Sequence, residues 1–213
     1  MNLLVASRNK HKLEEIRAIF NLPDIALVSA DEIPNLPEVI EDGATFQVNA
    51  IKKAVTLAMF AHLWTIADDS GLEVDALGGA PGVHSARYAG EPVDYAANNA
   101  KLLEELDGIP LRSARFWCVV AMSSPSGRAQ IVEGKCEGRI ICEIRGKEGF
   151  GFDPLFVPEG YEHTFAEMNS SLKNMISHRA AALRQAKEKW GSVLSGGGND
   201  WPRIMRSNRL SKP

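Results

Sequence analysis

The sequence predicts an α/β protein, because short apolar runs that suit buried strands alternate with segments of helical periodicity. A run at 3–6 precedes apolar residues at helical spacing over 13–20, and a helical pattern over 45–62 precedes a second run at 64–67. Strands that alternate with helices favour a sheet flanked by helices. A chain of 213 residues, 45% of them hydrophobic, is long enough for one domain or two closely packed lobes.

Composition and charge exclude several classes of protein. The formal net charge of −3 argues against a protein that coats nucleic acid, although it allows a local basic pocket for phosphates. No apolar run reaches the ~18 residues that a membrane span needs, and the N-terminus lacks the pattern of a signal peptide, so we expect no membrane contact. Cys118, Cys136 and Cys142 lack metal-site spacing, and we expect them to be reduced thiols in the cytoplasm.

A polar, cationic loop follows the first predicted strand and leads into the first predicted helix. It consists of Ser7, Arg8, Asn9, Lys10, His11 and Lys12. Free backbone N–H groups and the helix dipole favour an anion at such a position, and the lysines add positive charge. The loop is either a phosphate-binding cradle or a solvated turn with a helix cap, and these residues alone do not decide between the two.

The second predicted helix, over 45–62, follows a loop-rich stretch at 23–37 and an acidic segment at 41–43. The loop-rich stretch contains one possible strand, at 25–28. Asn49 and Lys53 are four residues apart in the helix and therefore share a face. A lysine in mid-helix is usually solvated, so this position alone assigns Lys53 no function.

The central stretch, 66–88, contains two adjacent carboxylates, Asp68 and Asp69, where we expect the preceding strand to give way to a loop. Small residues follow at 70–71 and 78–82, and they would let a ligand come close. Successive strand side chains point to opposite faces, so we expect only one aspartate to face a cleft. A solvated acidic turn is the alternative, but a pair placed directly after a buried strand favours a ligand site.

After the central stretch the sequence predicts one helix and three strands. We expect the helix to begin at Pro92 and to end near Leu106. The strands are predicted at 114–122, 129–133 and 139–144, with a turn at 124–127 between the first two. We expect these strands to form a second lobe.

A glycine between two aromatic residues follows the loop 146–151, in the order Phe150, Gly151, Phe152, Asp153. One ring could stack on a planar base, and the carboxylate could accept a hydrogen bond from it. The alternative is that the rings belong to the core, which we expect for one of the two.

The C-terminal part begins with a long helix, predicted over 170–190. Ser177 could also act as an N-cap residue and place His178 and Arg179 in the first turn of a helix. Residues 195–213 have a different composition, rich in glycine and then basic, and we expect them to form a flexible tail.

Several of these strings together resemble the Ham1/RdgB family of inosine and xanthosine triphosphate pyrophosphatases. They are ADDSGL, LGGAPG and SARY in the central stretch, the loop at 7–12, FGFDP at 150–154 and SHR at 177–179. Their order, from about Leu3 to about Leu183, makes the resemblance far more specific than any single string. It implies a mixed, elongated sheet flanked by helices in a single domain, 1–194, with an active-site cleft between two lobes, as in the Ham1 and Maf proteins.

The resemblance also implies a reaction and the residues that perform it. The implied protein is a cytoplasmic homodimer, joined through its second lobe, that uses Mg²⁺ to hydrolyse ITP, dITP or XTP to the monophosphate and pyrophosphate. Asp69 would be the base, Lys53 a second catalytic residue, and Glu41 and Asp69 the metal ligands. The implied substrate-binding residues are Ser7, Arg8, Asn9, Lys10, His11, Lys12, Ser70, Phe150, Gly151, Phe152, Asp153, Lys173, His178 and Arg179.

One position departs from the family pattern, and other functions compete with the implied one. The family commonly has a glutamate before the Asn-Ala pair of the second helix, where this chain has Val48, so that glutamate is not essential here. The main alternative is a nucleotide-binding protein without turnover, and Maf-type pyrophosphatases are the nearest enzymatic one. The motif of a Walker-type NTPase does not occur, and a two-carboxylate glycosidase would not need the lysines or the 7–12 loop.

Overall fold

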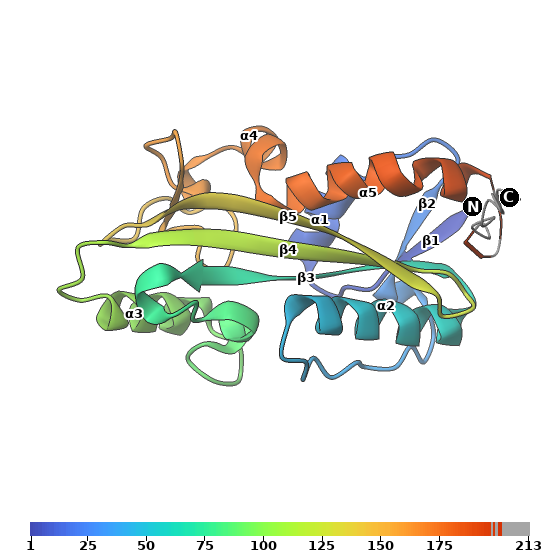
Figure 1. Cartoon of the computed structure of the whole chain (residues 1–213), viewed down its shortest axis with the longest axis horizontal. Coiled ribbons are helices and arrows are strands. Elements are labelled where there is room, and N and C mark those ends of the chain that lie inside the picture. Colours follow the sequence, from blue (N-terminus) through green and yellow to red (C-terminus); the bar gives the residue numbers. More distant parts are fainter. Residues whose placement is uncertain (197, 199, 202–213) are drawn as a thin grey trace, which may run out of the picture.

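Three long strands run through the molecule and contribute to both of its lobes. The computed structural model describes residues 1–196, 198, 200 and 201. In this part of the chain one sheet has the order β2-β1-β3-β4-β5-β6. The strands are β1 Asn2–Val5, β2 Ala26–Ser29, β3 Trp64–Val74, β4 Ser113–Ser123, β5 Ala129–Ile140 and β6 Phe156–Pro158. β1 is parallel to both of its neighbours and every later pair is antiparallel, which confirms the predicted mixed, elongated sheet (Figure 1).

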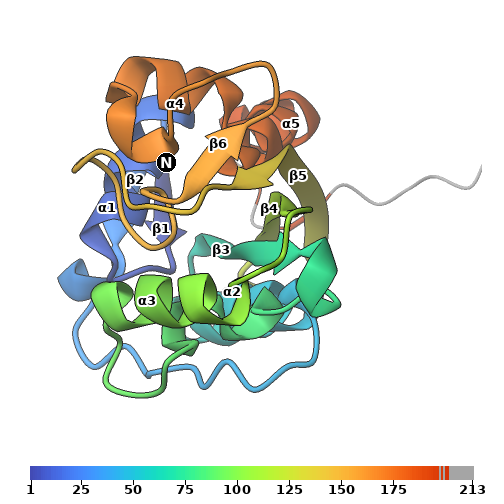
Figure 2. The same cartoon turned by 90° about the vertical axis from the view of Figure 1, so that its left-hand side faces the viewer.

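Helices cover both faces of the sheet. The α-helices of the described residues are α1 Lys10–Ile19, α2 Phe46–Ala61, α3 Tyr95–Glu105, α4 Ser170–Ile176 and α5 His178–Ser195. Short 3-10 helices are η1 Ala30–Glu32, η2 Asp75–Leu77, η3 Gly82–Arg87 and η4 Phe165–Glu167. α2 and α3 lie on one face of the sheet, and α1, α4 and α5 lie on the other, as both Figure 1 and Figure 2 show.

The hydrophobic core is divided between the two lobes. In the first lobe, one buried cluster contains Ile66 and Trp190 on the side of α5, and another contains Leu57 on the side of α2. A third cluster fills the second lobe. β4 contributes Met122 to the first of these clusters and Phe116 to the third. The predicted strands therefore do not form a second lobe by themselves, because each long strand is shared by both lobes.

β3 and β5 are longer than the sequence predicts. β3 continues to Val74 because β4 pairs with it throughout, with Asp68 opposite Val120 and Asp69 opposite Val119. The prediction that the two aspartates begin a loop is therefore wrong. β5 is one strand rather than two, since β4 also pairs with it along its whole length, and residues 141–144 lie outside any strand.

The helices begin where a side chain caps them. α3 starts after Pro92, because Asp94 accepts hydrogen bonds from two backbone N–H groups of the first turn. Ser177 ends α4 and caps α5, so the segment 170–190 holds two helices, as the N-cap reading of this serine predicts. Thr45 caps α2, and the bounds of α2 and β4 agree with the predicted ones to within one residue.

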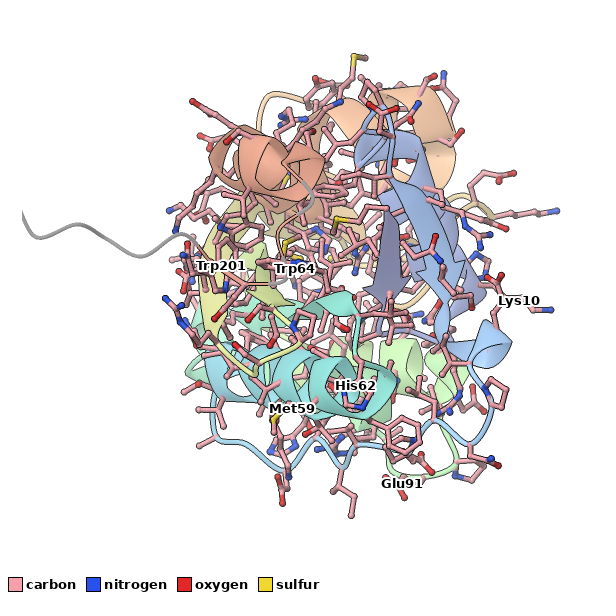
Figure 3. The ribbon with its side chains drawn as sticks, turned by 90° about the vertical axis from the view of Figure 1, so that its right-hand side faces the viewer. Lys10, Met59, His62, Trp64, Glu91 and Trp201 are labelled. Atoms are coloured by element: carbon pink, nitrogen blue, oxygen red, sulfur yellow. The ribbon has the colours of Figure 1, made fainter. Side chains whose placement is uncertain are left out.

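The described residues after α5 pack on the first lobe. Trp201 is buried beside Trp64 and Trp190, with ring centroids 4.8 and 6.0 Å away, and Figure 3 shows Trp201 next to Trp64. Asp200 pairs with Arg128 at 3.1 Å. The expectation of a flexible tail does not hold for these two residues. For 197, 199 and 202–213 the same expectation lies outside the described residues.

Two further features bear on the sequence analysis. No helix in the described part of the chain has both the length and the apolar character needed to cross a bilayer. The cysteines are free: Cys118 is buried, Cys136 is half-buried and Cys142 is exposed.

Candidate active site

The cavity lies at the edge of β3 that β1 leaves uncovered. β1 pairs with β3 only as far as Ile66, and the N–H of Ala6 donates a last hydrogen bond to the carbonyl of Ile66 at 2.8 Å. Beyond that point the edge opens into a cavity of about 790 Å³. Its walls come from the loops at 6–9, 36–42 and 150–153, and from α1, α2, η3, α4 and α5. Core residues of both lobes reach it, so the predicted cleft between the lobes is present.

The loop before α1 supplies one end of the cavity. Four of the predicted substrate-binding residues line it: Ser7, Arg8, Asn9 and Lys12. The Asn9 side chain also caps α1, by accepting hydrogen bonds from the N–H groups of His11 and Lys12. The other two residues of the loop, Lys10 and His11, do not line the cavity. Lys10 points into solvent (Figure 3), and His11 stacks on Phe150 at a centroid distance of 5.4 Å.

The adjacent aspartates of β3 point to opposite faces of the sheet, which confirms that only one faces the cavity. Asp69 lines the cavity, where its Oδ2 accepts a hydrogen bond from Asn49 Nδ2 at 3.0 Å. Asp68 points toward the opposite face and accepts from Arg179 Nη2 at 3.1 Å, while Lys12 Nζ lies 3.2 Å away. The two carboxylates therefore have separate environments although they are neighbours in the chain.

These environments shift the two pKa values in opposite directions. Burial raises the pKa of Asp69 to about 6, although the nearby charges of Lys12 and Lys53 act against the increase. Burial acts in the same sense on Asp68, but there Lys12 and Arg179 outweigh it and hold the pKa well below its usual value. Asp68 is therefore a permanent negative charge. Asp69 is a carboxylate that can exchange a proton near neutral pH.

Glu41 and Lys53 form the acidic and basic pair on the α2 side of the cavity. Lys53 Nζ lies 2.9 Å from Glu41 Oε1, and the lysine is buried rather than solvated. Arg87 of η3 donates a hydrogen bond to the backbone carbonyl of Glu41 at 3.1 Å. The loop that carries Glu41 is therefore held against both α2 and η3.

The donor set fits a divalent cation that also binds the substrate. Glu41 and Asp69 place two carboxylates on one cavity. No group of three or more His, Cys, Asp or Glu in the described residues is arranged to hold a metal alone. Mg²⁺ is typically bound by one or two carboxylates together with substrate phosphates. The two acids fit this mode and do not form a closed metal cage.

The 150–153 loop forms the wall of the cavity next to the start of α1, where His11 stacks on Phe150. Phe150 is half-buried, and its ring lies 5.0 Å from Lys173 Nζ and 5.7 Å from the guanidinium carbon of Arg179. Phe152 belongs to the second-lobe core, as expected for one of the two rings, although it also borders the cavity. Asp153 accepts hydrogen bonds from the Phe150 N–H at 2.8 Å and from Lys173 at 2.6 Å, and so fixes the loop.

His178 and Arg179 lie in the first turn of α5, behind the Ser177 cap. His178 stacks on Phe116 at a centroid distance of 4.7 Å, and its Nδ1 has no hydrogen-bond partner among the described residues. Burial lowers its pKa well below the usual value, and the charges of Arg179 and Lys173 add to that effect. His178 is therefore neutral at physiological pH.

Three residues of the site are absent from the sequence predictions. Glu15 forms ion pairs with Lys173, at 2.9 Å, and with Arg179. Arg87 donates a hydrogen bond to the backbone carbonyl of Glu41. Phe116 stacks against His178. Glu15 follows Lys12 by three residues and therefore shares its helix face, which is a usable signal. The other two have no local signal, because their partners lie 46 or more residues away.

Comparison with known proteins identifies the relatives of this chain. The Ham1 family model matches residues 3–189. The dITP/XTP pyrophosphatase of Desulforamulus reducens is 53% identical over 190 residues, which cover 88% of this chain and 94% of that protein. The protein of the same name from Shouchella clausii is 50% identical over 189 residues, covering 87% of this chain and 94% of that one.

Solved structures show the same fold. The Staphylococcus aureus Ham1 protein is 37% identical with a TM-score of 0.81, and the alignment covers 93% of this chain and all of that one. A HAM1 protein from Coxiella burnetii is 39% identical with a TM-score of 0.82, and covers 92% of this chain and 99% of its own.

Proposed function

The chain belongs to the Ham1 family, and we propose that it hydrolyses the deaminated purine nucleoside triphosphates dITP, ITP and XTP to the monophosphate and pyrophosphate. Relatives named dITP/XTP pyrophosphatase match it over most of its length. The observation that carries the proposal is a single cavity whose lining brings buried cationic side chains together with the carboxylates of the α2 side. These residues are Lys12, Lys53, Lys173, Arg179, Glu41 and Asp69.

The phosphate end of the substrate fits the side of the cavity near α1 and α2. A triphosphate carries three to four negative charges, which must be neutralised before water can attack. Lys12 and Lys53 come from different helices and both line the cavity next to Asp69. Lys173 pairs with Asp153 of the 150–153 loop and with Glu15 of α1, so its charge lies beside the Phe150 ring.

Glu41 and Asp69 are the residues that would hold Mg²⁺ together with the phosphates. The ion would supply neutralisation of the phosphate charge. Asp69 is placed to accept the proton of the attacking water, and its raised pKa suits a base that works near neutral pH. Lys53, paired with Glu41, is placed to neutralise charge on the departing pyrophosphate.

The base end fits a purine with a carbonyl at its six-position. Phe150 offers a half-buried ring beside Arg179, and a neutral His178 can donate through one ring nitrogen. The six-position oxygen of hypoxanthine and xanthine accepts a hydrogen bond, whereas the amino group of adenine donates one. A site of donors therefore favours the deaminated bases.

A homodimer and a cytoplasmic location also belong to this proposal. They rest on the family resemblance, and the free cysteines are consistent with a reducing compartment. Neither strengthens the assignment of the reaction.

A panel of nucleoside triphosphates, assayed with Mg²⁺ and with EDTA, tests the proposed reaction. We expect kcat/KM for dITP, ITP and XTP to exceed that for ATP by at least ~10²-fold, because a donor-lined site leaves adenine's amino group unpaired. EDTA should abolish turnover. Tight binding of XTP without turnover in Mg²⁺ would instead identify a nucleotide-binding protein.

The position of bond cleavage is a second expected result. Lys12 and Lys53 reach the phosphate side of the cavity from two different helices, so the whole triphosphate is held while water attacks the α phosphorus. Hydrolysis of ITP in ¹⁸O-labelled water should therefore give labelled IMP and unlabelled pyrophosphate, read by mass spectrometry. Orthophosphate as the first product, or label in the pyrophosphate, would contradict attack at the α phosphorus.

A further inference from the structure

Asn49 of α2 connects the two acids of the site and has no role in the account above. Its side chain is buried, with 1% of the residue exposed. Nδ2 donates a hydrogen bond to Asp69 Oδ2 at 3.0 Å, and Oδ1 accepts one from the Gly43 N–H at 2.7 Å. Gly43 is two residues from Glu41, so one amide group spans the distance between the two carboxylate-bearing segments.

The partners of Asn49 fix which way its amide points. A backbone N–H can only donate, so the atom facing Gly43 must be the oxygen, and the NH₂ group must therefore face Asp69. Asp69 Oδ1 accepts a separate hydrogen bond from the Ser70 N–H at 3.0 Å. Both oxygens of Asp69 are thus oriented by the protein, and Asn49 is the only side chain among the described residues that donates a hydrogen bond to Asp69.

The Glu41 segment depends on such contacts because it has no regular secondary structure of its own. Residues 36–43 precede α2 as a loop. Lys53 holds the Glu41 carboxylate at 2.9 Å, and Arg87 holds its carbonyl at 3.1 Å. A Cβ atom at Gly43 would lie 2.6 Å from Asn49 Oδ1, so the glycine allows the backbone to approach the amide closely.

We propose that Asn49 is a positioning residue that sets the separation and orientation of Asp69 relative to Glu41. The donor side of its amide holds Asp69, and the acceptor side holds the loop that carries Glu41. This inference rests on the proposed function, because it treats the two acids as partners in one reaction.

Two variants separate the donor from the acceptor. Asn49→Leu keeps the branched shape of the side chain and removes both hydrogen bonds. Asn49→Asp keeps an acceptor for the Gly43 N–H and places an oxygen, instead of a donor, against Asp69. We expect kcat for XTP to fall by about 10- to 100-fold in both, the range for residues that orient ligands of a metal site, with KM within about threefold of wild type.

Two carboxylates bind a divalent ion only weakly without phosphates, so Mn²⁺ is titrated into the millimolar range without nucleotide, and electron paramagnetic resonance then gives a readout that does not depend on turnover. We expect Mn²⁺ affinity to fall by about 10-fold or more in Asn49→Leu. Gln47→Leu is the matched control: Gln47 lies on the same helix and donates to the Glu133 carboxylate at 2.8 Å, and neither residue lines the cavity. It should keep both kcat and Mn²⁺ affinity.

Either folded Asn49 variant with wild-type kcat and Mn²⁺ affinity would overturn the inference, as would a pure increase in KM. Circular dichroism and the melting temperature establish folding, and the nearly isosteric Asn49→Asp keeps the test decisive if Asn49→Leu does not fold. If wild type hydrolyses none of the nucleotides, the proposed function fails. The Mn²⁺ titration still decides whether Asn49 positions the two acids.

Discussion

Replacing Asp69 with asparagine is expected to lower kcat for XTP by at least ~10²-fold, the scale of a lost acid or base group. The side chain keeps its shape and can still accept a hydrogen bond from Asn49, but it loses the charge that would bind Mg²⁺ and the ability to accept a proton. Steady-state kinetics over the nucleotide panel measure the effect. Little change in KM is expected, because the lysines that hold the phosphates are intact.

The stability of this variant should move in the opposite direction from its activity. Burial raises the pKa of Asp69 from 3.8 to about 6 in the folded protein. A raised pKa gives a stabilising contribution that is present below pH ~4 and lost as the pH rises through 6, so at pH 7 the ionised group costs stability. Without divalent cations, Asp69→Asn should therefore melt at the same or a higher temperature than wild type at pH 7.

A matched control lies on the same strand. Glu73 is four residues further along β3, accepts a hydrogen bond from Trp117 Nε1 at 2.8 Å, and does not line the cavity. Glu73→Gln makes the same chemical change away from the site and should keep wild-type kcat. If folded Asp69→Asn also turned over XTP at the wild-type rate, Asp69 would have no part in the chemistry.

The elements of the fold that could be predicted are those whose own sequence pattern determines them, without contacts to distant residues. α2 and β4 are long and strongly patterned, and the sequence places both to within one residue. The sequence predicts that β3 ends at Ala67, because two adjacent aspartates such as Asp68 and Asp69 are typical of a loop. In the structure the strand continues, since β4 pairs with it throughout and Lys12 and Arg179 compensate the buried charge of Asp68. That compensation comes from distant residues and is invisible locally.

For the candidate site, too, only the residues in local sequence patterns could be predicted. Motif residues such as Lys12, Asp69 and Arg179 were identified in sequence, because they lie in short strings that are specific together. Glu15 and Arg87 were missed, because their roles depend on contacts with residues far away in the chain: 164 positions separate Glu15 from Arg179. Periodicity describes one element at a time, whereas these contacts appear only after the helices have packed on the sheet.

Replacing Arg179 with alanine is expected to destabilise the protein strongly. The guanidinium is 1% exposed and donates hydrogen bonds to Asp68, Glu15 and Ser70. Among the described residues, its removal leaves Asp68 with Lys12 as its only ion-pair partner. Breaking a buried ion pair from one side costs about 3–5 kcal/mol, which corresponds to a melting temperature lower by about 6–20 °C for a chain of this size.

Two comparisons test the origin of that cost. Arg184 lies on the exposed side of α5, and Arg184→Ala should change the free energy of unfolding by less than ~0.5 kcal/mol. In the double variant Arg179→Met with Asp68→Asn, the loss should be smaller than the sum of the two single losses, because no unpaired charge is left between them. Strict additivity would show that Asp68 is not the residue that Arg179 neutralises.

Arg179→Ala also tests how the enzyme selects the purine base. A guanidinium has five N–H donors, and four of those of Arg179 are already used by Asp68, Glu15 and Ser70. One donor remains for the six-position oxygen of a purine, beside the neutral His178. Arg179→Ala should therefore lower kcat/KM for ITP and XTP much more than for ATP, measured well below the lowered melting temperature.

Arg179→Lys keeps the charge beside Asp68 without the planar guanidinium group, so it should recover part of the stability and little of the ITP preference. A wild-type ratio of ITP to ATP turnover in folded Arg179→Ala would mean that the base is read by Asp153 and the Phe150 ring instead.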